Sequence, residues 1–402
     1  MRYGKNEYGG PLASVEMLEA RQLLAAAWND AALLVDQDEA ASRYRKITGK
    51  NQSVAVIDTG VDYNHPALGG KWGKTVIAGY DFVRNDSNPM DESGHGTQVA
   101  GVIAAREFTY GGRKYKGVAP NAKIVALRVA DNSDYLPESR IERALKWVIK
   151  KHKRYNITAV NISLGEGDFS KKVSRGPYAD ELRKLKKMGI FTAAASGNEG
   201  VRTPAGINYP AADPNVLAVG SVNTRDVISP FTSRGPDLDL LAPGEGIATI
   251  LYNPSTRQHT YSAAAGTSFA APYATATAML IKQVNSRFSV NSIKAIIQDS
   301  ADWNQDGDVE RPATYLDFPR LDIGDAINLA YKRRGGARPL SYDKVDVQPA
   351  PKSIAVGAPT AGSTRSKTLG VAADDVQRTP FSEGSNTIGG DLLDRDEDLI
   401  CA

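Results

Sequence analysis

Short apolar runs alternate with helical patterns along most of the chain. Five runs are rich in alanine or β-branched residues and carry almost no charge: 53–60, 122–130, 157–165, 189–197 and 215–222. Runs of this kind are typical of strands buried on both faces of a parallel sheet. Between them lie helical stretches such as ESRIERALKWVIKKHKR. The alternation predicts a doubly wound α/β domain.

The pattern changes near both ends, which suggests three parts. Residues 1–27 contain SVEMLEARQLLAAA, apolar at helical spacing, and we interpret them as an N-terminal leader or docking helix. Residues 28–332 carry the alternation and form the predicted folded domain. Residues 333–402 are rich in small and polar residues and end in the acidic stretch DLLDRDEDL. Such a segment buries too little apolar surface to offset its ordering entropy, so we predict a flexible, disordered tail.

The composition limits the classes of partner. A net charge of +3 on 402 residues is too small to indicate a nucleic acid or a membrane surface. No apolar run approaches the roughly 18 residues of a membrane-spanning helix. The one cysteine, Cys401, allows no intrachain disulfide, so stability must come from the core or from ions.

Four polar residues stand where a predicted strand ends or a predicted helix begins: Asp58, His95, Asn198 and Ser268. Asp58 ends the run AVID, and Asn198 follows TAAASG. His95 lies between two glycines before a small-residue helix, and Ser268 opens the alanine-rich helix of AGTSFAAP. Sites in doubly wound sheets form at the carboxyl ends of the strands, so these residues are candidates for one site.

Each candidate also has an ordinary structural interpretation. Asp58 and Asn198 can be turn residues, and Ser268 can be a helix cap. His95 can be structural, or a zinc ligand, although no second histidine or cysteine lies at ligand spacing. Thr267 already supplies a good cap, which leaves Ser268 surplus to that role.

Together, the four residues supply every part of an acyl-transfer site. A serine needs an adjacent base to become a nucleophile, and histidine suits that role because its pKa lies near neutrality. Asp58 would orient His95 and stabilise the imidazolium. The Asn198 side chain and the Ser268 backbone N–H would donate to the oxyanion. Pro272 removes the N–H that would bond the Ser268 carbonyl, so we expect the first turn of this helix to depart from regular geometry.

The motifs AVIDTGVDYNHPAL, SGHGTQVAGVIAA, VNISLG, AAASGNEG, FTSRGP, LLAPGEGI and AGTSFAAPYA resemble those of the subtilisin-like serine peptidases (subtilases). They occur in the family's order across about 28–332. The resemblance implies a three-layer α/β fold with helices on both faces of a mostly parallel central sheet. It also implies a serine endopeptidase with Asp58, His95 and Ser268 as the triad and Asn198 as the oxyanion donor.

The resemblance implies that polypeptide substrates bind as an added strand. The implied substrate-binding positions are Ser163, Leu164, Gly165, Ala194, Ala195 and Asn208. None of these carries a fixed charge, which favours a broad or apolar preference over a basic one. The alternative function is a non-catalytic subtilase-fold protein that binds peptides. The complete triad favours the enzyme.

The sequence departs from the family pattern at several positions. Gln98 replaces a second histidine, and Phe269 and Tyr273 replace the usual residues after the serine. None is a triad position, so we expect altered packing and intact chemistry. About 27 residues precede the predicted domain, in place of the family's folded inhibitory prodomain. We expect that folding needs no prodomain or that the leader substitutes for it.

No cofactor is required for the predicted chemistry, but calcium is the family's usual structural ion. Asp302, Asn304, Asp306 and Asp308 have EF-hand-like spacing. Ala313 stands at the twelfth position, where an acidic ligand is expected. The segment is therefore interpreted either as a calcium loop or as a polar turn.

The remaining predictions concern the compartment and the oligomeric state. The leader lacks the usual form of a secretory signal, but it resembles a short motif, L-E-x-R-x-L-L, found on some bacterial exported proteins. We expect an extracellular or exported bacterial protein, with a cytoplasmic location as the alternative, and a monomer.

Overall fold

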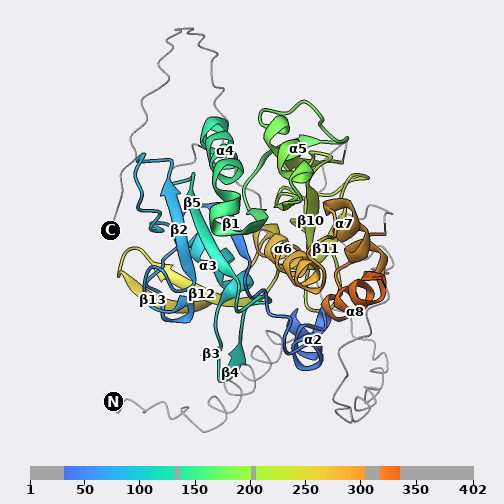
Figure 1. Ribbon diagram of the computed structural model, residues 1–402, viewed down its shortest axis with the longest axis horizontal. Coiled ribbons are helices and arrows are strands. Elements are labelled where there is room, and N and C mark those ends of the chain that lie inside the picture. Colours follow the sequence, from blue (N-terminus) through green and yellow to red (C-terminus); the bar gives the residue numbers. More distant parts are fainter. Residues whose placement is uncertain (1–30, 132–135, 201–204, 304–316, 336–402) are drawn as a thin grey trace, which may run out of the picture. The chain divides into compact units, whose positions relative to one another are not determined.

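The computed structural model describes residues 31–131, 136–200, 205–303 and 317–335 (Figure 1). The predicted leader and all but the first three residues of the predicted tail lie outside these residues, so the proposed three-part organisation stays a prediction. The last helix extends one residue past the predicted domain boundary, to Arg333. No helix in the described part of the chain is long and apolar enough to cross a membrane.

A nine-stranded sheet forms the centre of the described structure. Its strands are β1 (Ser53–Asp58), β2 (Val76–Asp81), β5 (Lys123–Arg128), β6 (Ile157–Ile162), β8 (Phe191–Ala195), β10 (Leu217–Val222), β11 (Leu240–Pro243), β14 (Asp302–Trp303) and β15 (Pro319–Arg320). They run in the order β14-β15-β11-β10-β8-β6-β1-β5-β2, and only the β14–β15 pair is antiparallel. The predicted mostly parallel sheet is confirmed.

All five apolar runs become central strands, and β1 and β10 are buried along their whole length. The sequence analysis missed β2 and β11. The edge strand β2 is only partly buried and contains a glycine and a tyrosine, so its pattern is not a continuous apolar run. At four residues, β11 is too short to stand out from the surrounding loops.

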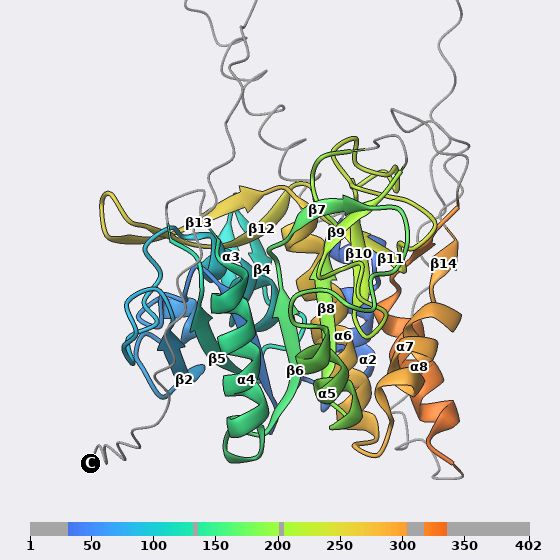
Figure 2. The same ribbon diagram turned by 90° about the horizontal axis from the view of Figure 1, so that it is seen from above.

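Helices cover both faces of the sheet (Figures 1 and 2). One core cluster packs against α4 and α5, and the other against α2, α3, α6, α7 and α8. The bounds are α2 (Gln37–Arg43), α3 (His95–Ala104), α4 (Glu138–Tyr155), α5 (Ala179–Lys187), α6 (Thr267–Val284), α7 (Val290–Asp299) and α8 (Ile323–Arg333). The predicted three-layer architecture is confirmed.

The residues of α4 and α6 reflect how deeply each helix is buried. In α4 the buried residues recur at helical spacing, Ile141, Ala144, Leu145 and Val148, so one face packs on the sheet. In α6, by contrast, every residue except Lys282 and Gln283 is buried. Its many alanines let this helix lie close to the sheet and to α3 at once.

Three two-stranded sheets flank the main one. They are β3–β4 (Phe108–Tyr110, Arg113–Tyr115), β7–β9 (Glu166–Phe169, Ile207–Tyr209) and β12–β13 (Ile247–Asn253, Gln258–Ala264). A single 3-10 turn, η1 (Pro66–Leu68), follows the loop after β1. The β12–β13 hairpin leads directly into Gly266 and α6, so it delivers the predicted nucleophile to the carboxyl edge of the sheet.

Candidate active site

Asp58 is the last residue of β1 and is fully buried. Its Oδ1 accepts a hydrogen bond from the backbone N–H of Thr59 at 2.8 Å and lies 2.7 Å from His95 Nδ1. The parallel pairing with β5 and β6 fixes this strand end in the middle of the sheet. The carboxylate is therefore partnered by an imidazole 37 residues away in the chain.

His95 is the first residue of α3, as predicted. The backbone comes very close at this junction. A Cβ on Gly96 would collide with the carbonyl of Gly60 and lie 3.1 Å from Asp58 Oδ1. Glycine at 96 thus allows the start of α3 to approach the end of β1 closely enough for the Asp58–His95 contact.

The neighbours of His95 shift the pKa of its ring. Burial lowers the pKa of His95, but the charge and hydrogen bond of Asp58, with a smaller contribution from Asp91, outweigh it, so the net pKa is raised. The protonated ring is thus stabilised relative to an isolated histidine. Because Nδ1 faces Asp58, Nε2 is the nitrogen that can exchange a proton with a second group.

Ser268 is the second residue of α6 and is 9% exposed. Its hydroxyl donates to the carbonyl oxygen of Ser163 at 3.1 Å. A hydroxyl has one proton, so Ser268 must turn from this carbonyl before it can donate to His95. Hydrogen bonds of catalytic groups are often misaligned without substrate and tighten in the complex.

The carbonyl that Pro272 deprives of a partner finds another one. The Ser163 hydroxyl donates to the Ser268 carbonyl at 2.7 Å. The helix runs on through Pro272, while its first turn is tightened by a bond from Phe269 N–H to the Gly266 carbonyl at 3.0 Å. The first turn therefore departs from the regular pattern, and the segment that follows β6 supplies the missing donor.

The predicted cap of this helix is wrong. The N-cap is Gly266, and Thr267 lies inside the helix. The Asn198 Oδ1 atom accepts from Thr267 N at 2.9 Å and from Thr267 Oγ1 at 3.0 Å, so an amide from a distant loop caps α6. With Oδ1 engaged in this way, Nδ2 is the end of Asn198 that can donate to another group.

The other predicted substrate-binding positions border the same region. Ser163, Leu164 and Gly165 follow β6, Ala194 and Ala195 end β8, and Asn208 lies in β9. A Cβ on Gly165 would lie 3.3 Å from the Asn208 Cβ, and a Cβ on Gly197 would lie 2.6 Å from its Oδ1. Asn208 thus packs between the segments that follow β6 and β8. The side chain of Ser163 is buried and donates a hydrogen bond to α6.

The model of the subtilase family matches residues 49–319, which include all four candidate residues. The chain belongs to the subtilase family. It is 35% identical to subtilisin E of Bacillus subtilis (strain 168) over 258 residues, which cover 64% of this chain and 62% of that protein. It is 34% identical to the minor extracellular protease Epr of the same organism over 237 residues, covering 59% and 33%. The chain thus spans less than two thirds of either relative.

A solved subtilase structure is also similar. The crystal structure of a cold adapted subtilisin-like serine proteinase matches with a TM-score of 0.54 and 29% identity, covering 67% of this chain and 89% of that one. The family and the three-layer subtilisin-like fold inferred from the sequence motifs are therefore confirmed.

The positions where this subtilase departs from the motif pattern are packing positions. The Gln98 amide donates to Ser262 Oγ at 2.9 Å, which ties α3 to β13. The Phe269 ring lies 5.5 Å from the His95 ring, centre to centre. Tyr273 is buried in the core. These contacts agree with the expectation of altered packing.

The sequence analysis missed a charged residue next to Asn198. Glu199 follows Asn198, and its carboxylate accepts from Ser233 Oγ at 2.7 Å. A Cβ on Gly197 would lie 2.5 Å from Glu199 Oε2, so this carboxylate borders the same turn as Asn198. The predicted substrate-binding residues themselves carry no charge, so this carboxylate is an additional charge next to Asn198, and the broad or apolar preference stays a prediction. The sequence signal was the adjacent glutamate in GNEG.

The calcium loop is only partly described. Asp302 lies in β14, and its Oδ2 pairs with Arg320 Nη2 at 2.8 Å, so its charge is already balanced. Asn304, Asp306 and Asp308 lie outside the described residues. Among the residues that are described, no group of three acidic, histidine or cysteine side chains could hold a metal ion. Calcium binding at this loop stays a prediction.

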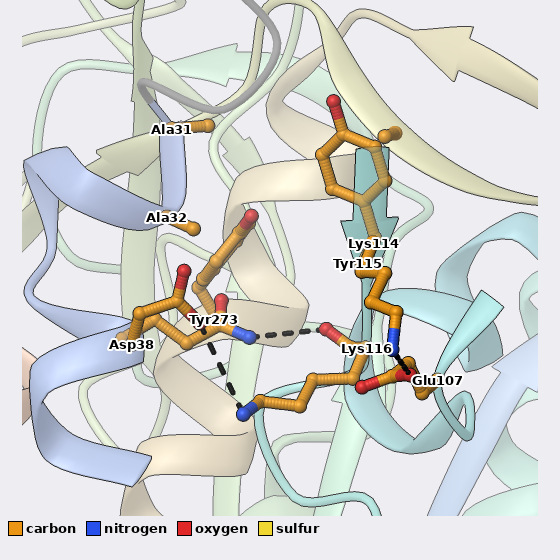
Figure 3. A pocket seen from close by; sticks show the side chains of 10 residues that line it. Ala31, Ala32, Asp38, Glu107, Lys114, Tyr115, Lys116 and Tyr273 are labelled. Carbon is orange, nitrogen blue, oxygen red and sulfur yellow. Dashed lines mark hydrogen bonds and ion pairs between the residues drawn. The ribbon is translucent and has the colours of Figure 1, made fainter. Parts of the chain in front are cut away.

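A pocket of about 190 Å³ lies away from the candidate active site, between the start of α2 and β4 (Figure 3). Its walls include Asp38, Glu107, Lys114 and Tyr273. The charged groups are already paired, because Lys114 contacts Glu107 at 2.7 Å and Lys116 lies 4.0 Å from Asp38. None of the candidate catalytic residues lines this pocket.

Proposed function

We propose that this subtilase is a serine endopeptidase that hydrolyses peptide bonds through an acyl-enzyme. The observation that carries the proposal is the 2.7 Å contact between the buried Asp58 and His95, together with a serine in the first turn of α6, where the next residue, Phe269, places its ring 5.5 Å from the His95 ring. Asp58 holds the ring with Nε2 available and stabilises it once it is protonated. The raised pKa of His95 supports the same role.

The proposed reaction proceeds in two balanced steps. Ser268 Oγ forms a bond to the peptide carbonyl carbon while His95 Nε2 takes the hydroxyl proton. The C–N bond then breaks, and the leaving amine takes that proton from Nε2. A water molecule repeats the attack with His95 again as base, which releases the acid and restores the Ser268 hydroxyl.

Two donors are proposed to stabilise the oxyanion. The Asn198 Nδ2 is available because its Oδ1 is held by Thr267. The backbone N–H of Ser268 belongs to the first turn of α6, where N–H groups have no partner within the helix and the helix dipole is positive. Fixed donors of this kind stabilise the developing negative charge in the transition state.

We propose that the substrate is an extended polypeptide that adds as a strand beside Ser163, Leu164 and Gly165. Backbone hydrogen bonds would supply affinity, and alternate side-chain pockets would supply specificity. Ala194, Ala195 and Asn208 are the proposed pocket walls. Since one relative is named an extracellular protease, we also propose that this chain acts outside the cell. We further propose that it acts as a monomer.

Labelling of the native protein by a fluorophosphonate tests the catalytic proposal. We expect one equivalent of label on Ser268, loss of label in Ser268→Ala, and unchanged labelling in Ser255→Ala, a control at an exposed serine. The alternative, a non-catalytic peptide-binding protein, predicts no labelling of the folded chain and equal peptide binding by Ser268→Ala. That result would overturn the proposal.

A further inference from the structure

Asp91 is a fully buried carboxylate four residues before His95. It accepts five hydrogen bonds. Oδ1 accepts from Ser93 N at 2.9 Å, Gly94 N at 2.8 Å and Thr59 Oγ1 at 2.9 Å, and Oδ2 accepts from Thr97 N at 2.9 Å and Thr97 Oγ1 at 2.5 Å. The proposed reaction gives this residue no role.

All five partners of Asp91 are donors, an arrangement that favours the ionised carboxylate. Three are backbone N–H groups. The Thr59 hydroxyl accepts from Gly96 N at 2.9 Å and the Thr97 hydroxyl accepts from Asp62 N at 2.9 Å, so each directs its own proton to Asp91. Burial raises the pKa of Asp91, and the donated hydrogen bonds oppose that rise. A protonated carboxyl would place its O–H against a donor.

The five donors belong to the two segments that carry Asp58 and His95. Thr59 directly follows Asp58, and its hydroxyl bridges Asp91 to the Gly96 N–H. The other donors lie at 93–97 and surround His95 in the chain. Gly94, the N-cap of α3, has no side chain of its own, so Asp91 caps this helix.

We propose that Asp91 is a positioning residue for the reaction: it fixes the start of α3 against the end of β1, so that His95 meets Asp58 in the correct geometry before substrate binds. This inference rests on the proposed peptidase function. Because the network is complete without substrate, the orientation is established in the free protein. A displacement of about 1 Å at such a contact can cost about 100-fold in rate.

The charge of Asp91 also acts on the His95 ring. The charged groups that raise the pKa of His95 are Asp58, from β1, and Asp91, from its own loop. The neighbouring elements contribute apolar contacts: Phe269 from α6, and Leu251 from β12 near Gly94. Removal of the Asp91 charge should therefore lower the pKa of His95, so the acid limb of kcat/KM should move to lower pH.

The test is Asp91→Asn in the full chain, with rates expressed per active site titrated by a fluorophosphonate. We expect kcat to fall by about 10- to 100-fold, KM to change by less than about 2-fold, and the acid limb to move to lower pH. Asp86→Asn is the matched control, because Asp86 is an exposed carboxylate in the same loop. It should leave all three quantities unchanged.

Thr59→Val and Thr59→Ser keep the test decisive if Asp91→Asn does not fold. Valine removes the hydroxyl bridge but leaves the Asp91 charge, so kcat should fall while the acid limb stays in place. Serine restores the bridge and should restore kcat. Two results would show that Asp91 has a purely structural role. One is a folded Asp91→Asn with wild-type kcat per titrated site and an unshifted acid limb. The other is wild-type kcat in Thr59→Val. Failure of the wild-type chain to label would instead overturn the peptidase proposal itself.

Discussion

Single residues in this site take their roles from partners far away in the chain. Asn198 illustrates this: its sequence context fits a turn residue, yet its Oδ1 holds the first turn of α6 through Thr267. The same two bonds orient the amide group of Asn198, so they also fix the direction in which its Nδ2 atom points. A structural contact thereby prepares a group for the proposed chemistry.

The first prediction concerns Asn198. Asn198→Ala should lower kcat by about 10²- to 10³-fold with little change in KM, because the donor acts in the transition state. The comparison variant is Asn198→Asp, which keeps an oxygen to accept from Thr267 but has no Nδ2 donor. Both variants should lose kcat, although the alanine variant alone should lose the cap, at about 1 kcal/mol of stability. Steady-state kinetics and thermal melts check this; a raised KM with normal kcat would mean that Asn198 mainly binds substrate.

At the scale of elements, the start of α8 shows how a buried cap depends on pH. Asp322 is the N-cap of α8, and its side chain accepts from Asp325 N. Burial, with Asp36 and Asp325 nearby, raises the pKa of Asp322 to about 7. The unfolded chain binds this proton only below about pH 4. Between these values the folded state binds more protons, so its stability falls as the pH rises from about 4 to 7.

The second prediction follows from this sign. Asp322→Asn keeps a good N-cap and removes the buried charge, so it should raise Tm at pH 8 and leave Tm near the wild-type value at pH 4. Thermal melts at the two pH values measure the effect. Asp317→Asn is the control, because Asp317 is an exposed carboxylate that is not among the charges raising the pKa of Asp322, and it should not show this pH-dependent gain. A lower Tm at pH 8 in Asp322→Asn would contradict the account.

At the scale of the whole molecule, two core clusters hold the described structure together. Every buried member of both clusters lies between Ala31 and Ala330. The last helix, α8, contributes Ile323, Ala326, Ile327 and Ala330 to the core on one face of the sheet. Stability should therefore depend on the chain up to the end of α8.

The third prediction is that deletion of 336–402 leaves Tm within about 2 °C of the full chain and leaves kcat unchanged, because it removes none of the described core. Deletion of 323–402 is the comparison, since it also removes α8, and it should prevent folding or lower Tm strongly. Calorimetry and peptide hydrolysis assays distinguish the two. A large loss in the shorter deletion would mean that the tail belongs to the folded domain.

The sequence by itself indicated five strands of the central sheet, the three-layer fold, the family and the candidate triad residues. Strands such as β1 and β10 are buried on both faces, so nearly all of their consecutive residues are apolar or small. The motif residues stand at strand ends and helix starts, and the parallel sheet brings those ends to one edge. Local patterns were sufficient because each strand and each motif consists of residues close together in the chain.

The tertiary structure alone decided how the site is held. Asn198 caps α6 across 69 residues, Ser163 satisfies the Ser268 carbonyl across 105, and Thr59 meets Asp91 across 32. Each bond depends on where loops return in space, and no periodicity in the sequence encodes that distance. Buried polar groups must find partners, but the sequence does not say which ones. The sequence motifs therefore indicate the candidate triad residues, while contacts between distant segments of the chain set their geometry.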